Sequence, residues 1–189
     1  MEVPMPVELR VGTFRLNVPG PSDLADVMSA LDDPEISQWS PHRPDSVSMR
    51  ERADAWIEQR MQWSLEHCSW VIRDHDGFLI GQVSLFHIDR AAGDAEIGYW
   101  LVPRARRRGI AAASVEAATG YAFRELGVHR IQLFHAVGNP ASCRLAMRCG
   151  FLLEGTLREG FRYNDGLRHD EHLHARLGTD PRPHLPEPR

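Results

Sequence analysis

The middle of the chain holds the segment that most constrains the fold. It starts as the strand-like Glu96–Val102, is stopped by Pro103, and continues through a basic loop over 104–108. It then becomes the alanine-rich Ile110–Leu126, which Gly127 follows. Proline cannot donate to a sheet ladder, and glycine commonly ends helices. The segment therefore predicts a strand, a basic loop and a long helix in direct succession.

The junction of this loop with the helix is predicted to bind an anion. The first N–H groups of a helix lack partners inside it, and the helix dipole puts positive partial charge at the same end. Gly109 allows close approach to the backbone, and the arginines of 106–108 carry forked donors that suit phosphate. Cations at a positive helix end are unfavourable by roughly 0.3–1 kcal/mol each unless an anion binds. The alternative is a solvated basic loop.

Strand and helix signals alternate along the rest of the chain. In chain order we expect a strand over 8–18, a helix from a cap at 21–23 to about 31, a loop over 36–46, a helix over 48–66, strands over 69–74, 79–89 and 95–102, the helix 110–126, a strand over 131–137, a helix over 140–149, and strands over 151–159 and 170–177. This order predicts an α+β fold, in which a mixed, mainly antiparallel sheet is flanked by helices.

The composition favours one soluble domain over residues 8–177, with proline-bearing tails over 1–7 and 178–189. The chain has 189 residues, of which 42% are hydrophobic and 25% are charged, as in ordinary globular proteins. A net charge of −4 argues against nucleic acid as a partner. No apolar run approaches the ~20 residues that span a membrane. No signal peptide is visible, so we expect a cytoplasmic protein whose three cysteines stay reduced.

Two blocks of sequence resemble the GNAT superfamily of N-acyltransferases. Arg106-x-x-Gly109-x-Ala111 looks like the pyrophosphate loop of that superfamily. The block 139–155 resembles the branch that contains RimJ and RimL, the ribosomal-protein alanine N-acetyltransferases. The order of elements agrees over residues 8–177. The resemblance implies a GNAT-type sheet that is splayed between its fourth and fifth strands, with an acyl-coenzyme A bound in the gap.

The resemblance also implies which residues bind coenzyme A (CoA). The backbone at Leu101 and Val102 would pair with the pantetheine arm, and Asn139 would hydrogen-bond the same arm. Ser142 would lie near the thioester sulfur. The pyrophosphate would lie on the loop and the first helical turn, which supply Arg106, Arg107, Arg108, Gly109, Ile110, Ala111 and Ala112. Asn139 has an alternative reading as a plain helix N-cap.

Glu96 and Ser142 are the candidate catalytic residues. Many superfamily members place a tyrosine acid seven residues after the asparagine, where this chain has Ala146, so Ser142 is the nearest substitute. Glu96 could accept the amine proton if burial raises its pKa, and the alternative is a surface carboxylate. The peptide N–H groups beside Leu101 and Val102 could stabilise the oxyanion.

Aromatic and imidazole side chains are the candidates for the acceptor pocket, namely Trp39, His42, Phe86, His87 and Trp100. Phe86 and Trp100 have an alternative reading as core residues. RimL-type enzymes carry a glutamate where this chain has Gly160-Phe161-Arg162, and this departure weighs against a ribosomal alanine substrate.

The predicted function is transfer of an acetyl group from acetyl-CoA to a primary amine by direct attack in a ternary complex. The amine is a protein N-terminus or a small molecule, and a homodimer is an expected assembly. Succinyl-CoA or another acyl-CoA is an alternative donor. A non-catalytic acyl-CoA-binding module is an alternative from another class. Nucleic-acid binding by the basic loop is disfavoured because no aromatic platform accompanies the arginines.

No metal is expected. The segment 169–174 contains His169, His172 and His174, three histidines that are candidate metal ligands. On a strand, however, His172 and His174 share a face while His169 faces the other way. Three convergent ligands are therefore not evident from this segment.

Overall fold

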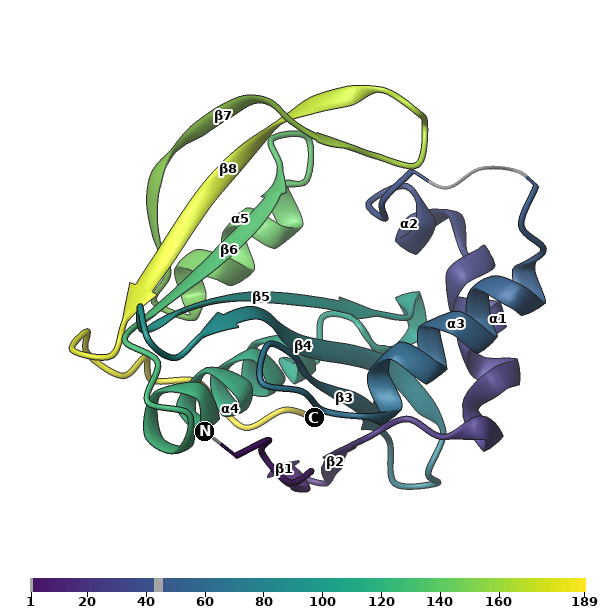
Figure 1. The fold of residues 1–189 in the computed structure, drawn as a ribbon, viewed down its shortest axis with the longest axis horizontal. Helices are drawn as coiled ribbons and strands as arrows, with labels where there is room; N and C mark the ends of the chain where they lie inside the picture. Colours follow the sequence, from purple (N-terminus) through teal and green to yellow (C-terminus); the bar gives the residue numbers. More distant parts are fainter. Residues whose placement is uncertain (1, 43–45) are drawn as a thin grey trace.

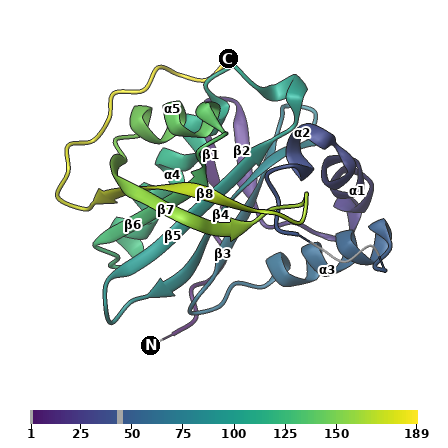
Figure 2. The ribbon, with the colours of Figure 1, turned by 90° about the horizontal axis from the view of Figure 1, so that it is seen from above.

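The computed structural model describes residues 2–42 and 46–189, so part of the expected loop over 36–46 lies outside the described residues. One sheet runs in the order β1-β2-β3-β4-β5-β6-β8-β7 (Figures 1 and 2). Its strands are β1 (Leu9–Val11), β2 (Phe14–Asn17), β3 (Cys68–Arg73), β4 (Leu79–Asp89), β5 (Asp94–Leu101), β6 (Arg130–Ala136), β7 (Leu152–Arg162) and β8 (Arg168–Leu177). The helices are α1 (Leu24–Asp32), α2 (Pro34–Ser37), α3 (Met49–Met61), α4 (Ile110–Glu125) and α5 (Pro140–Arg148).

The sheet is mixed and mainly antiparallel, which confirms the expected fold class. β5 and β6 pair in parallel, and every other neighbouring pair of described strands is antiparallel. A parallel pair needs a crossover, and α4 supplies it between β5 and β6. Among the described residues, no helix combines the length and the apolar character that crossing a membrane requires.

Three local expectations were wrong. The strand expected over 8–18 is a hairpin, because the chain turns between β1 and β2 at Gly12, whose φ of +58° is a left-handed value. The expected loop begins with the short helix α2, capped by the Asp33 carboxylate on the Glu35 N–H. α3 ends at Met61 rather than near residue 66. Immediately beyond it, Trp63 is buried, donates to the Ser69 carbonyl and packs on the Trp70 ring.

Alternating side chains on β3 build the two sides of the core. Trp70 and Ile72 belong to the cluster that also contains residues of α4, while Val71 faces the cluster formed by α1 and α3. Both faces of the central strands are therefore covered, which explains the nearly continuous apolar run of β3. The capping box expected at Ser48 is confirmed, because its hydroxyl accepts from the Glu51 N–H and the Glu51 carboxylate accepts from the Ser48 N–H.

β5 and β6 part soon after they meet. Their pairing covers only Asp94–Arg130, Ala95–Ile131 and Glu96–Gln132. Beyond Glu96 the two strands separate, and the second half of β5 has β4 as its one paired neighbour (Figure 1). This fork confirms the expected splay. The fourth and fifth strands of the expectation are β5 and β6 here, because the first strand is split in two.

A buried ion pair joins β8 to α4. The guanidinium of Arg176 donates to the Glu116 carboxylate and to the Cys149 carbonyl, and the side chains of both charged residues are at least nine-tenths buried. Arg182, which follows β8, donates to the other oxygen of Glu116 at 3.0 Å. The pair therefore ties the last strand and the segment after it to the long helix.

We expect Glu116→Ala to lower the free energy of unfolding by roughly 3–5 kcal/mol, because it leaves the Arg176 charge buried without its carboxylate. Urea denaturation followed by circular dichroism measures the change. Glu125→Ala is the matched control, since Glu125 is an exposed residue of the same helix and should change stability by no more than about 0.5 kcal/mol. Equal losses in the two variants would contradict a special role for the pair.

Candidate functional site

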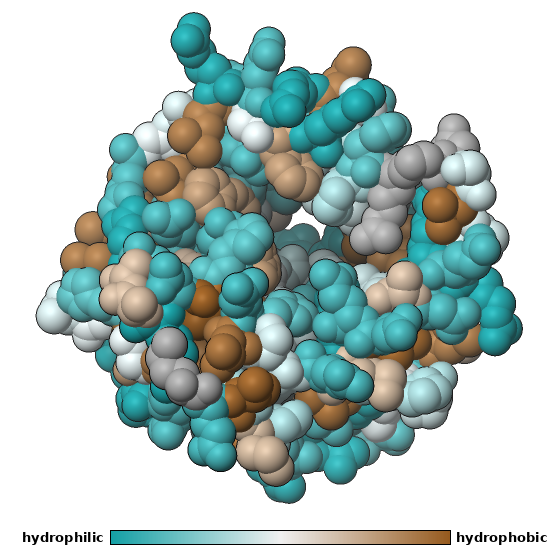
Figure 3. Space-filling model, in the orientation of Figure 1, coloured by the Kyte–Doolittle hydropathy of each residue, from teal (hydrophilic) through white to brown (hydrophobic). Residues whose placement is uncertain are grey.

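A cavity of about 640 Å³ occupies the fork between β5 and β6. Its walls come from α2, from the second half of β5, from the loop and first turn of α4, and from α5. In Figure 3 the molecule is hollowed over this gap, between the part formed by β6–β8 and the part formed by β5 and α2. The residues of the expected cofactor set that line it are Leu101, Arg106, Arg107, Gly109, Ile110, Ala111, Ala112, Asn139 and Ser142.

The start of α4 forms one end of the cavity. Gly109 is its N-cap with a φ of +81°, a left-handed conformation that glycine adopts without strain. The first helical bond runs from the Ala113 N–H to the Gly109 carbonyl at 3.0 Å. The N–H groups of residues 110–112 therefore have no acceptor within the helix. Small side chains at Ala111 and Ala112 line the cavity here, so an anion can reach this end of the helix.

The three arginines of the loop take different directions. Arg106 lines the cavity, donates to the Leu101 carbonyl at 3.1 Å and pairs with Glu35 of α2. Arg107 also lines the cavity, with a left-handed φ of +62°. The side chain of Arg108 is not among the lining groups, because its Nε donates to the Arg189 carbonyl at 2.6 Å and its guanidinium lies over Phe14. The structure thus brings two of the three side chains together.

Of the two backbone donors expected to stabilise the oxyanion, those of Leu101 and Val102, one is already engaged. The Val102 N–H donates to the Ile80 carbonyl at 3.0 Å, so it cannot also stabilise an oxyanion as expected from the sequence. Donors in an antiparallel ladder alternate in direction, and the Leu101 N–H therefore points away from β4 toward the gap.

Tyr99 is a residue of the cavity that the sequence analysis missed. Its hydroxyl lies 2.9 Å from the Ser142 hydroxyl, and both residues line the cavity. Burial raises the pKa of Tyr99 to about 12, although the hydrogen bond to Ser142 acts in the opposite direction. The phenol therefore keeps its proton at neutral pH. Strand alternation could have found it, because Tyr99 lies between Ile97 and Leu101 on one face of β5.

Asn139 and Ser142 are held in place by the first turn of α5. The Asn139 Oδ1 accepts from the Ser142 N–H at 3.1 Å, so Asn139 is an N-cap as the alternative reading held. It also lines the cavity, and its side-chain NH₂ remains a donor. The same cap therefore orients the Ser142 hydroxyl toward Tyr99.

Glu96 lies at the point where the strands part. Its carboxylate is 2.9 Å from the His87 Nδ1, and its side chain is 26% exposed. His87 reaches this position because the β4–β5 pairing is irregular between Phe86 and Asp89, which leaves His87 with a left-handed φ of +49°. Bulges beside functional sites commonly re-aim a side chain in this way.

The five candidate acceptor residues do not gather in one place. Trp39 and Trp100 line the cavity, whereas His42, Phe86 and His87 do not. The Trp39 ring packs edge-on against Tyr163, with ring centroids 6.2 Å apart, and Trp100 packs against Trp56 of α3.

Glu171 was not predicted from the sequence either, and like Glu96 it lies near the fork without lining the cavity. It is buried on β8 and accepts a hydrogen bond from the Tyr163 hydroxyl at 2.7 Å. Burial raises the pKa of Glu171, the Tyr163 hydrogen bond opposes this, and the negative charge of Glu96 raises it further. The two carboxyl groups are thus close enough to interact. A cationic group between them would relieve their repulsion.

Comparison with known proteins gives the site a family context. Residues 14–152 match the family model described as an acetyltransferase (GNAT) domain. YdaF of Bacillus subtilis (strain 168) is 41% identical over 96 residues, which are 51% of this chain and 52% of YdaF. The ribosomal-protein-serine acetyltransferase of Escherichia coli (strain K12) is 34% identical over 99 residues, or 52% and 55% of the two chains. The chain thus spans about half the length of these curated relatives.

A solved structure resembles the chain over a longer stretch. The spermidine N-acetyltransferase from Vibrio cholerae, in complex with CoA and spermine, superposes with a TM-score of 0.74 at 26% identity. The match covers 88% of this chain and 96% of that chain. The likeness therefore extends over nearly all of the sheet and its helices.

Proposed function

Because this chain belongs to the GNAT acetyltransferase family, in its RimJ/RimL-like branch, we propose that it transfers the acetyl group of acetyl-CoA to a primary amine. One observation carries the proposal. The cavity at the fork joins an anion-binding helix start at one end to a buried Tyr99–Ser142 hydroxyl pair at the other. A thioester with a diphosphate tail needs both features, one for binding and one for the departure of sulfur.

The basic loop and the start of α4 would bind the pyrophosphate. The N–H groups of residues 110–112 would donate to its oxygens, and Arg107 would add a forked donor. Arg106 would have to share its guanidinium between the phosphate and Glu35. The pantetheine arm would then lie along Leu101 of β5, within reach of Asn139 on α5.

The reaction would proceed by direct attack in a ternary complex. The amine nitrogen attacks the thioester carbonyl, and the Leu101 N–H stabilises the negative charge that develops on its oxygen. The carbon–sulfur bond then breaks, and Tyr99 protonates the departing thiolate directly or through Ser142. The proton lost by the amine passes to Glu96, which stands at the fork. Tyr99 thus fills the role left open by Ala146.

The acceptor would be an amine that is protonated, and therefore cationic, when it reaches the site. Glu96 and Glu171 place two interacting carboxyl groups at the fork, and such a pair suits a group that arrives as an ammonium ion. Among the similar proteins, one named structure holds spermine and one named relative acts on a ribosomal protein. We infer that small polyamines and protein N-termini are the two classes to assay.

Gly109→Val should weaken CoA binding at least tenfold while the protein stays folded. The branched side chain would stand where phosphate approaches the helix start. A Cβ added at Gly109 would lie 3.5 Å from Pro188, which is an ordinary van der Waals contact and no clash. Isothermal titration calorimetry measures the affinity. Gly77→Val is the matched control. Gly77 has a similar φ of +90°, a Cβ added there would meet no atom within 4 Å, and the residue does not line the cavity. Equal affinity in the two variants would place the phosphates elsewhere.

Tyr99→Phe should reduce kcat by about 10²–10⁴-fold with little change in CoA affinity, because it removes the proton donor for the thiolate. Ser142→Ala should also lower kcat, at every pH. The assay follows CoA release from acetyl-CoA with spermidine and with a peptide that has a free N-terminus. Tyr121→Phe is the control, since Tyr121 is a buried tyrosine of the core. Losses of kcat under threefold in both site variants would show that neither hydroxyl acts chemically. If the unmodified protein turned over no amine at all, that result would favour a non-catalytic acyl-CoA-binding module.

Glu96→Gln should lower the rate most at low pH and recover toward the unmodified enzyme as the pH rises. The reason is that high pH supplies neutral amine without a base, whereas low pH makes deprotonation limiting. A pH–rate profile with saturating acetyl-CoA tests this. His87→Gln serves as a companion, because it removes the imidazole beside Glu96 and leaves the carboxylate. A deficit of Glu96→Gln that does not change with pH would exclude a role as base.

A further inference from the structure

We propose that His135, Cys143, His172 and His174 bind one zinc ion between α5 and the sheet, at a site separate from the transfer cavity. Each residue offers one ligand atom, and the four atoms all lie within 4.8 Å of one another. Tetrahedral zinc has Zn–N distances of about 2.0–2.1 Å and a Zn–S distance of about 2.3 Å, which set its ligand atoms about 3.3–3.6 Å apart. The His135 and His174 Nε2 atoms are 3.1 Å apart, and the Cys143 Sγ is 3.8 Å from the His174 Nε2.

The strand register explains why these residues meet. His135 of β6 lies directly opposite His172 of β8, so the two side chains share a face of the sheet. His174 is two residues further along β8 and points to the same side. Cys143 belongs to α5, which packs against β6 and β7. Residues 169–174 alone do not reveal this set, because His135 of β6 and Cys143 of α5 complete it from other parts of the chain.

The hydrogen bonds of the two buried rings leave a space that a cation fits. The Nδ1 atoms of His135 and His174 face the carbonyl oxygens of Ala136 and Phe151, at 2.8 and 3.3 Å. A carbonyl oxygen only accepts, so both Nδ1 atoms carry the proton. A neutral imidazole has a single N–H, and each Nε2 therefore presents a lone pair to the other.

Neither an extra proton nor the cysteine thiol resolves this contact. Both rings are buried, and burial disfavours an imidazolium. The Cys143 S–H can donate to one ring nitrogen, which leaves the other lone pair without a donor. A zinc ion accepts all of these lone pairs at once. Imidazoles whose second nitrogen donates to a backbone carbonyl are also the usual form of histidine ligands.

His172 contributes a ring nitrogen that lacks a hydrogen-bond partner among the described residues. Its Nδ1 is buried, and no hydrogen-bond partner for it is found within residues 2–42 and 46–189. A buried polar atom without a partner is unfavourable, and coordination through this nitrogen removes the penalty.

The ligand set indicates a structural role. Three imidazoles and one thiolate suit zinc, and four protein ligands leave no open position for a substrate. Ser142 and Arg144 line the cavity while Cys143 does not, so the Cys143 side chain turns to the opposite side of α5. A metal there would fasten α5 to β6 and β8, and α5 in turn carries Asn139 and Ser142. The proposed transfer chemistry itself uses no metal.

The test uses the untagged full chain, stripped with a chelator and titrated with Co²⁺ as a spectroscopic probe. We expect about one Co²⁺ per chain, with the intense visible absorption of tetrahedral cobalt and a thiolate-to-metal band that Zn²⁺ abolishes on displacement. Zn²⁺ should also raise the melting temperature, because it binds only the folded ligand set. A spectrum of octahedral cobalt, or no binding, would overturn the proposal.

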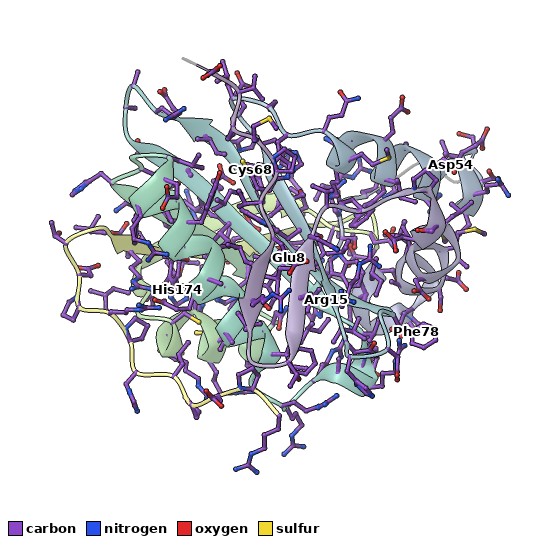
Figure 4. The ribbon with its side chains drawn as sticks, turned by 90° about the horizontal axis from the view of Figure 1, so that it is seen from below. Glu8, Arg15, Asp54, Cys68, Phe78 and His174 are labelled. Carbon is purple, nitrogen blue, oxygen red and sulfur yellow. The ribbon has the colours of Figure 1, made fainter. Side chains whose placement is uncertain are left out.

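Two matched pairs of variants assign the ligands. Cys143→Ala should lose the thiolate band and the thermal shift, whereas Cys68→Ala should keep both, because Cys68 is a buried thiol on β3 that lies apart from His174 (Figure 4). His172→Ala should weaken binding at least tenfold, whereas His169→Ala on the same strand should not. Unchanged binding in His172→Ala would overturn the site even if Cys143→Ala failed to fold.

Discussion

The short contact between β5 and β6 is the constraint on which the rest of the site depends. Three residue pairs hold the two parts of the sheet together, and the strands then separate. The separation leaves β5 with an unpaired edge, and backbone groups on an unpaired edge require another partner. α4 and α5 both direct their N-terminal turns at this opening. A single departure from regular pairing therefore creates the binding space, its free backbone donors and the convergence of two helix starts.

The features that sequence could predict are those determined by neighbouring residues. The capping box at Ser48, the helix that follows Gly109 and the cap at Asn139 each involve groups within three or four positions. Alternation also predicts which side chains of one strand share a face, as it does for His172 and His174. The one strand that was misjudged, over 8–18, has the same alternation on both sides of Gly12. The apolar positions change phase at this turn, from Leu9 and Val11 to Phe14 and Leu16, and this shift of one residue was the signal of the hairpin.

The parts of the site that sequence could not predict depend on contacts between distant segments. Tyr99 contacts Ser142, which lies 43 positions later, and Glu171 is buried beside Tyr163 and close to Glu96. The use of the Val102 N–H by β4 likewise depends on strand register. Arg108 looked equivalent to its two neighbours, but its side chain contacts the end of the described chain instead of the cavity. Local spacing carries no information about such partners.

The contact between Arg108 and Arg189 has a thermodynamic consequence. Residues 188 and 189 lie against the loop that precedes α4, where Pro188 approaches Gly109 and the Arg189 N–H donates to the Arg108 carbonyl. A ligand that draws the Arg108 guanidinium to itself must first break the bond to the Arg189 carbonyl. Because binding free energies are reciprocal, docking of this terminal segment weakens such a ligand by the same factor by which the ligand weakens docking. The C-terminal residues and the ligand of the loop are in that sense competitors for one side chain.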